Sequence, residues 1–196
     1  MKKEAISIQP AAAARALVRP RDHVWAICGY LLIGLAALLP RVLALGLFIT
    51  DDEANFWLMR SDIFLKAIRT GDFAATAITA HPGVTTMWLG AAGIVLRRAL
   101  FDGGILHSDA FPVVLTLMRL PAALVHVAVV LLGYHLLRRM FPPKSSPLLA
   151  LLAALLWAAD PFVIGYSKLL HTDALAGSFM TLSMLCLLYT SDAADE

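Results

Sequence analysis

Three consecutive acidic residues, Asp51, Asp52 and Glu53, follow a long apolar stretch and precede the aromatic pair Phe56-Trp57. If the apolar stretch crosses a bilayer, these acids lie at its end, in or near the interface. Carboxylates that crowd and desolvate one another there have at least one raised pKa, which suits a general base or a cation ligand. The alternative is an ordinary helix start, because Asp and Glu are favoured in the first turn of any helix.

The elements that position these acids are predicted to be membrane helices. The chain has 196 residues, of which 60% are hydrophobic and 15% are charged, and its mean hydropathy is +0.76. Soluble domains are typically about 45–50% apolar and about 25% charged. The composition therefore predicts an all-α, polytopic membrane protein. We expect no nucleic-acid partner, because no basic patch is interleaved with aromatic residues.

Four apolar segments are predicted to cross the membrane, and two further segments are predicted to lie beside it. The expected spans are residues 24–49, 111–137, 147–165 and 174–188. The expected juxtamembrane helices are residues 53–69, which are amphipathic, and 83–98, which are interfacial or re-entrant. The chain thus divides into a basic lead (1–22), a membrane module (23–185) and a tail (186–196).

The orientation of the predicted helices depends on whether Val84–Leu96 crosses the membrane. Basic residues before the first span place the N-terminus in the cytoplasm. If Val84–Leu96 crosses, Asp173 faces the cytoplasm. If it lies in the outer interface, the loop with Arg138, Arg139 and Lys144 is cytoplasmic. Asp52 and Asp173 then share the outer face. We favour this second arrangement because it keeps the basic loop inside and explains the short apolar run.

Several motifs in a fixed order resemble the integral-membrane glycosyltransferases of the GT-C superfamily. They are Arg41 late in the first span, Asp52-Glu53 after it, Thr70–Phe73, His81–Trp88, Asp160-Pro161, Tyr166–Lys168 and Thr172–Ala174. The pattern is most similar to protein O-mannosyltransferases and to the aminoarabinose transferases that modify lipid A. The resemblance covers roughly residues 24–185, which would be the N-terminal part of a full-length enzyme.

The resemblance implies a bacterial inner-membrane enzyme that uses a polyprenyl-phosphate-linked sugar outside the cytoplasm. The acceptor would be a protein hydroxyl, a lipid or a glycan. Asp52 matches the family's candidate general base, with Glu53 beside it, and Asp173 matches a second acidic position. Asp51 is an extra acid, which leaves open a register shift of one residue.

The leaving phosphate requires positive charge or hydrogen-bond donors. The candidate phosphate-binding residues are Arg41, His81, Arg119 and Lys168. The alternative for the longer cations is anchoring at the membrane interface. His81 is alternatively a polar helix lead-in, or a metal ligand together with a carboxylate, so a divalent metal stays an open question.

Two other functions fit the same residues. In a transporter fragment, Arg41, Asp52 and Asp173 would form a charged pathway within the bilayer. The third possibility is a non-catalytic membrane scaffold. From Cys186 onwards the sequence resembles a translated sequencing adapter, and the alternative is a genuine acidic tail. We therefore expect the native sequence to stop near Leu185 and the chain to be inactive alone.

Overall fold

The structure, a computed structural model, describes residues 20–80, 82–141 and 147–195. Every regular element within these residues is a helix. Four helices are long and apolar enough to cross a membrane, and a bent pair of shorter helices would make a fifth crossing. The chain is an all-α, polytopic membrane protein, as its composition predicts. Most of the basic lead, and also His81 and Lys144, lie outside the described residues.

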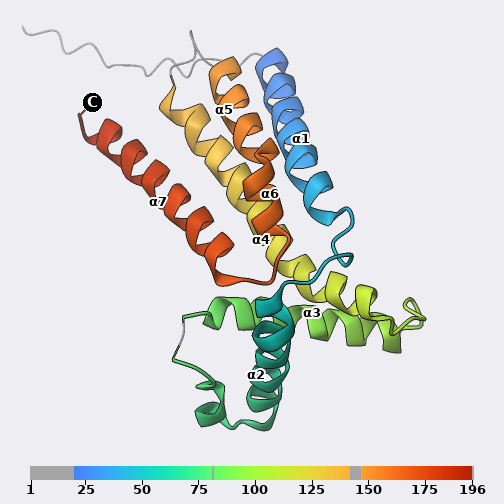
Figure 1. Cartoon of the computed structure of the whole chain (residues 1–196). Coiled ribbons are helices and arrows are strands. Elements are labelled where there is room, and N and C mark those ends of the chain that lie inside the picture. Colours follow the sequence, from blue (N-terminus) through green and yellow to red (C-terminus); the bar gives the residue numbers. More distant parts are fainter. Residues whose placement is uncertain (1–19, 81, 142–146, 196) are drawn as a thin grey trace, which may run out of the picture.

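Four helices form an elongated bundle (Figure 1). They are α1 (Pro20–Val42), α4 (Phe111–Met140), α5 (Pro147–Ala159) and α7 (Thr172–Asp195). Ala150, Ala154 and Ala158 are fully buried at four-residue intervals along α5, where they pack with Ile33 and Ala37 of α1. Small side chains on one helix face allow helix backbones to approach closely without a large apolar core.

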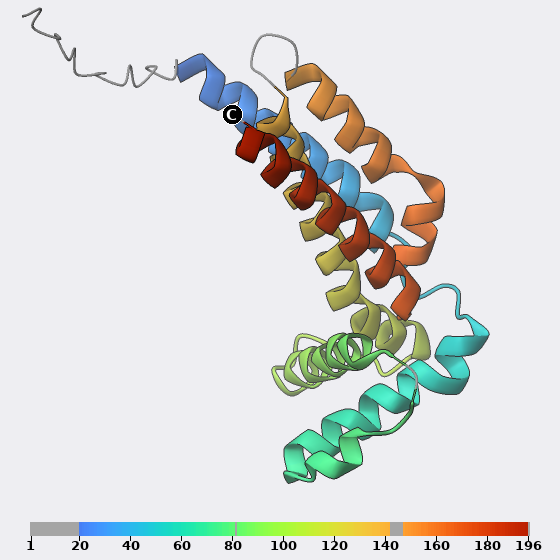
Figure 2. The same cartoon turned by 90° about the vertical axis from the view of Figure 1, so that its left-hand side faces the viewer.

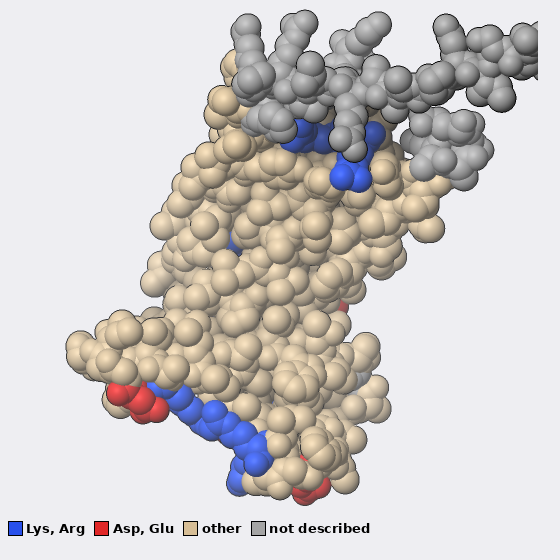
Figure 3. Space-filling view, turned by 180° about the vertical axis from the view of Figure 1, so that it is seen from behind, with Lys and Arg blue, Asp and Glu red and all other residues tan. Residues whose placement is uncertain are grey.

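The outside of the bundle is apolar. Large hydrophobic side chains are exposed along its helices, including Leu31, Leu35 and Leu39 of α1 and Met180 and Met184 of α7. In Figure 3 the Lys and Arg side chains gather near the two ends, and the surface between them is mostly uncharged. An apolar band between charged ends is what a bilayer requires of a spanning protein.

The first helix ends at Val42, short of the predicted end at residue 49. Pro40 lies within its last turn and cannot donate a backbone hydrogen bond. Arg41 donates from Nη1 to the carbonyl oxygen of Ala37 (2.9 Å). Ala44 then takes a left-handed φ of 56°. The chain leaves the bundle here, and residues 43–50 lead to the acidic residues.

The predicted span 147–165 is two helices. α5 ends at Ala159, and α6 (Pro161–Ser167) follows at an angle of 55°. Pro161 has no N–H to continue the α5 ladder. The Asp160 side chain accepts a hydrogen bond from the Val163 N–H (2.9 Å), so it caps α6. Arg41 also stabilises the break, because its Nη1 donates a hydrogen bond to the Ala158 carbonyl at the end of α5 (3.0 Å).

Residues 51–80 and 82–102, here called the platform, lie across one end of the bundle. They comprise η1 (Glu53–Trp57), α2 (Leu58–Thr70), η2 (Phe73–Thr76) and α3 (Val84–Asp102). Figures 1 and 2 together show α2 and α3 running in directions unlike those of the bundle helices. α3 is apolar and long enough to cross a membrane by itself, yet it lies along the end of the bundle.

The platform has its own apolar core, which joins it to the bundle. Trp57, Phe64, Met87 and Ile94 are buried there, and Met118 of α4 packs among them. Gly93 of α3 lies against the α4 backbone, because an added Cβ would meet the Leu117 oxygen and the Met118 Cα. α2 ends at Gly71, whose φ is 74°.

Candidate functional site

The loop after α1 delivers two adjacent acids into opposite environments. The side chain of Asp52 is 56% exposed, and that of Glu53 is fully buried. Successive residues on a helix point roughly 100° apart, so neighbours at a helix start face different surroundings. Asp52 is largely exposed to solvent and contacts His171, whereas Glu53 points inward to α4 and to the backbone of Leu170.

Glu53 forms a buried, two-pronged ion pair with Arg119 of α4. Arg119 donates from Nη2 to Oε2 (2.6 Å) and from Nε to Oε1 (2.7 Å). Its Nη1 donates to the Leu45 carbonyl in the loop after α1. Two parallel bonds between a guanidinium and a carboxylate fix both groups in orientation as well as in distance. The pair therefore fastens the platform to α4 and to the end of α1.

The remaining bonds of Glu53 reach the loop before α7. The backbone N–H of Leu170 donates to Oε1 (2.8 Å), and the Thr50 hydroxyl donates to Oε2 (2.8 Å). Burial by itself would raise the pKa of Glu53. The hydrogen bonds from Arg119, Leu170 and Thr50 and the charge of Arg119 outweigh it, so the pKa lies below its usual value.

Glu53 consequently does not provide the raised pKa expected of the acidic trio. Both of its oxygens are occupied by donors, and its lowered pKa makes it a weak base. Arg119 is equally occupied and is only 2% exposed. Sequence reasoning assigned Glu53 to catalysis and Arg119 to phosphate binding, whereas the geometry pairs them with each other.

Asp52 and Asp173 meet on the two sides of one imidazole, that of His171. His171 Nε2 lies 3.1 Å from Asp52 Oδ2, and Nδ1 lies 3.5 Å from Asp173 Oδ2. The backbone N–H of Asp173 donates to Nδ1 (3.3 Å). Nδ1 is thus the acceptor, and the hydrogen-bond pattern assigns the proton to Nε2, which donates to Asp52. We call Asp52, His171 and Asp173 the acid–histidine cluster.

The acid–histidine cluster is open on one side and supported on the other. Asp173 is 69% exposed and His171 is 19% exposed. The Trp57 ring meets the imidazole edge-on, with 6.0 Å between the ring centroids. Trp57 is itself buried in the platform core. The fixed imidazole holds two solvent-facing carboxylates, which can orient a hydroxyl group and accept its proton.

His171 was not among the site residues predicted from the sequence. Its only sequence signal is its position two residues before Asp173, in the stretch His171-Thr172-Asp173. Asp52 lies 119 residues away along the chain. No periodicity in the sequence links positions so far apart, so only the folded chain reveals that His171 joins the two predicted acids.

The other predicted cations have separate positions. Arg41 is fully buried in the bundle, and its Nε and Nη2 have no hydrogen-bond partner among the described residues. Lys168 donates from Nζ to the Leu43 carbonyl (2.6 Å), beside the loop that leads to Asp52. His81 falls outside the described residues. Of the predicted phosphate-binding cations within the described residues, Arg41 and Arg119 are buried and Lys168 is half-buried.

The described residues contain no side-chain cluster that is arranged to bind a metal ion. No group of three or more His, Cys, Asp or Glu side chains there has the spacing to hold an ion. In the acid–histidine cluster the imidazole stands between Asp52 and Asp173, with one carboxylate on each ring nitrogen. A metal ion needs its ligands directed at one point.

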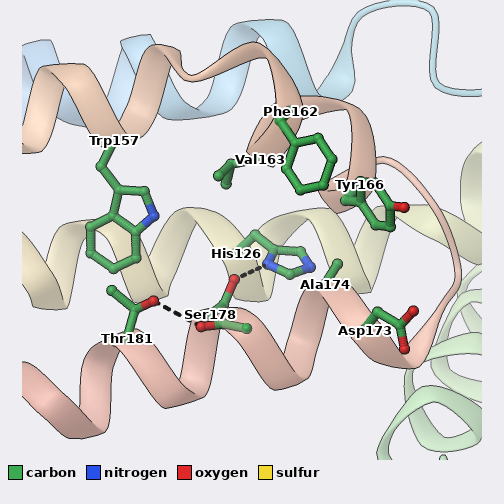
Figure 4. Close-up of a pocket in the computed structure, with 10 residues that line it drawn as sticks. His126, Trp157, Phe162, Val163, Tyr166, Asp173, Ala174, Ser178 and Thr181 are labelled. Carbon is green, nitrogen blue, oxygen red and sulfur yellow. Dashed lines mark hydrogen bonds between the residues drawn. The ribbon is translucent and has the colours of Figure 1, made fainter.

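A half-open cleft of about 400 Å³ begins at Asp173 and runs along the bundle between α5, α6 and α7 (Figure 4). Trp157, Phe162 and Tyr166 contribute its aromatic walls, and His126 of α4 contributes a polar side chain. Asp173 therefore belongs both to the cleft and to the acid–histidine cluster. The cleft connects the exposed acids with the membrane-facing side of the bundle.

The sequence was compared with known protein families and curated proteins, and the fold with solved structures, and none of the three comparisons gives a match. The fold and the site together define a polytopic helical membrane protein. It carries an acid–histidine cluster at one end of its bundle. Any more specific function must be argued from that cluster and its surroundings.

Proposed function

We propose that this chain carries the acidic site of a membrane glycosyltransferase. The enzyme takes a sugar from a polyprenyl-phosphate-linked donor and passes it to an acceptor outside the cytoplasm. One observation carries the proposal: Asp52 and Asp173, from opposite ends of the chain, both contact His171 at one end of the helix bundle. The sequence pattern had singled out the same two acids, for reasons independent of their contact.

The reaction uses each group of the cluster in a defined way. The acceptor oxygen bonds to the anomeric carbon of the sugar while the bond from that carbon to the phosphate oxygen breaks. The electron pair leaves with polyprenyl phosphate, and the acceptor's proton passes to the Asp52 carboxylate. His171 holds Asp52 in position through Nε2. Asp173 accepts a second hydrogen bond from the acceptor or the sugar.

The phosphate of the donor needs a cation that is not already paired. Lys168 meets this need, because its Nζ donates to the backbone carbonyl of Leu43 and the residue is only half-buried. Arg119 is committed to Glu53, and Arg41 is buried inside the bundle. The donor phosphate is therefore proposed to lie on the Lys168 side of Asp52.

The proposed orientation has the N-terminus in the cytoplasm of a bacterial inner membrane and the platform on the outer face. Single cysteines at positions 52, 81 and 173, in a background without Cys28 and Cys186, report the side directly. A membrane-impermeant maleimide added to intact cells should label all three. Labelling that requires permeabilised cells at any one of them would defeat the proposed topology.

The test of activity is sugar transfer from a radiolabelled polyprenyl-phosphate donor in membranes that contain the protein, expressed both as this chain and from the longest reading frame that includes it. Asp52→Asn should reduce transfer by about 10²-fold or more, the range attributed to a general base. Asp51→Asn is the matched control, because Asp51 is exposed and its side chain accepts a hydrogen bond from the nearby Asn55 amide. Equal loss in both variants, or no loss in Asp52→Asn, would move the base elsewhere.

A transporter is the second candidate, and buried Arg41 is the observation that favours it. An arginine with free donors inside a helix bundle is typical of ion and substrate pathways. A transporter predicts that purified protein in liposomes moves a charged solute and that Arg41→Met stops it. Transfer of sugar that survives Arg41→Met, with no flux, favours the enzyme.

A further inference from the structure

The cleft beside the acid–histidine cluster has the composition of a site for an amphiphilic ligand. Its walls are formed mainly by aromatic and aliphatic side chains, namely Trp157, Phe162, Val163, Tyr166 and Ala174. Phe162 and Tyr166 at its rim are 69% and 40% exposed. Because the bundle is surrounded by lipid, a half-open apolar cleft on its side admits a hydrocarbon chain directly from the bilayer.

A buried polar atom inside the cleft supplies independent evidence for a ligand. His126 is only 2% exposed, and its Nδ1 contacts the Ser178 hydroxyl (2.9 Å). Its Nε2 has no hydrogen-bond partner among the described residues. Figure 4 draws this nitrogen toward the end of the cleft where Tyr166 and Asp173 lie. Buried polar atoms are normally satisfied, so a bound polar group is expected near this nitrogen.

The charge at the end of the cleft restricts the polar head of the ligand. Asp173 lines the cleft, and Asp52 lies across the imidazole of His171 from it. Two carboxylates repel a phosphate or carboxylate head and accept hydrogen bonds from a hydroxyl. The apolar walls and the acidic end together fit a hydrocarbon chain that carries an uncharged, hydroxyl-bearing head.

We propose that the cleft between α5, α6 and α7 binds the chain of a hydroxyl-headed membrane lipid and presents its hydroxyl-bearing head to the acid–histidine cluster at the Asp173 end. This inference rests on the proposed sugar transfer and makes a lipid the class of acceptor. The lipid hydroxyl oxygen bonds to the anomeric carbon, and its proton passes to Asp52. The donor's polyprenyl phosphate leaves on the Lys168 side, outside the cleft.

Photo-labelling of the full 196-residue chain in phosphatidylcholine nanodiscs tests the proposal without any sugar donor. The probes are a long-chain alcohol with a diazirine in its chain and the corresponding alkyl phosphate. The alcohol should label peptides from residues 157–181, about tenfold more strongly than the phosphate does, the difference expected for one charge-assisted hydrogen bond. Equal labelling by both probes, or labelling spread evenly over all helices, would overturn the proposal.

Two glycines provide a matched pair of variants. Gly177 of α7 lines the cleft, and Gly165 of α6 is not among the lining residues. An added Cβ meets no atom within 4 Å at either position. Gly177→Phe should fill the cleft and reduce alcohol labelling about tenfold, because the bulky ring takes the space of the lipid chain and weakens its binding. Gly165→Phe should leave it unchanged. Labelling that survives Gly177→Phe would contradict the site.

A third variant tests the head rather than the chain. Asp173→Asn changes an exposed side chain, and it should keep chain labelling while removing most of the preference for alcohol over phosphate. A preference that survives this change would show that the acids do not select the head. If labelling behaves as predicted but the longer protein transfers no sugar, the lipid site stands and the transferase proposal fails. The reverse outcome overturns only the lipid acceptor.

Discussion

Asp52 and Glu53 are adjacent in the chain, yet they serve two different parts of the molecule. Glu53 is fully buried and shares both oxygens with Arg119, Thr50 and the Leu170 N–H. Asp52 is mostly exposed and contacts the imidazole of His171. One acid holds the fold together, and its neighbour remains available to a ligand. The difference teaches that an acidic run at a membrane surface need not act as one unit.

The two roles depend on each other. The Glu53–Arg119 pair draws together the end of α1, the platform, α4 and the loop before α7. That loop continues into His171 and Asp173. The buried pair therefore places His171 within reach of Asp52. Loss of the pair should separate His171 and Asp173 from Asp52. The reverse does not hold, since no bond of Glu53 passes through His171.

The largest effect is expected from breaking the buried pair. Arg119→Met leaves an uncompensated, fully buried carboxylate and should lower the free energy of unfolding by about 3–5 kcal/mol. Urea unfolding in detergent, followed by tryptophan fluorescence, measures it. The double variant Glu53→Gln/Arg119→Met should recover part of the loss, because it removes the orphaned charge. Additive losses in the double variant would show that the two groups do not interact.

The pH dependence of stability probes the same pair. The pKa of Glu53 is lower in the folded chain than in the unfolded chain, where it is about 4.3. Its stabilisation is therefore fully present above that value and is lost as the pH falls through the lower, folded pKa. Melting temperatures of the wild type should fall below about pH 4, and those of Glu53→Gln should fall less steeply. Parallel curves would contradict the account.

An intermediate effect is expected where the platform meets α4. Gly93→Ala places a Cβ against the Leu117 oxygen and the Met118 Cα, next to Arg119. Overpacking of this kind costs about 1–3 kcal/mol, and it should also weaken the contact between Asp52 and His171. Gly165→Ala is the control, because its Cβ meets open space. Equal stability of the two variants, measured by urea unfolding, would argue against close α3–α4 packing.

The smallest effect on stability is expected at the exposed cluster. Asp52→Asn and His171→Asn remove partly solvated contacts, which are worth about 0–1 kcal/mol after screening by water. Melting temperatures close to that of the wild type, alongside the loss of transfer predicted for Asp52→Asn, would sharpen the contrast with Glu53. A loss of stability as large as that of Arg119→Met would show that the exposed cluster and the buried pair do not differ in this way.

The sequence was sufficient for the fold class and for much of the helix order. Long apolar runs and a charged amphipathic segment are local signals, and they predicted apolar membrane helices and an amphipathic helix in the region of α2. The first span proved shorter and the segment at 147–165 proved to be bent, at Pro40 and Pro161 respectively. Proline marks such breaks in a sequence but does not fix the direction of the chain beyond them.

The site was predictable only in part, because its defining contacts span most of the chain. Asp52 and Asp173 were selected from sequence, and both lie in the cluster. The buried state of Glu53 was not predictable, since its partners Arg119 and Leu170 lie 66 and 117 residues away. Composition indicates that charges exist near a membrane, and packing alone decides which of them are paired.

The most direct test of the account is whether residues 52 and 171 are neighbours in the membrane. Asp52→Cys/His171→Cys, in a chain whose Cys28 and Cys186 are replaced by serine, is treated in native membranes with a short bismaleimide. The account predicts a high yield of the 52–171 crosslink by peptide mass spectrometry and a much lower yield for the control pair Asp51→Cys/His171→Cys. Equal yields, or no 52–171 crosslink, would contradict the convergence of the two acids on His171.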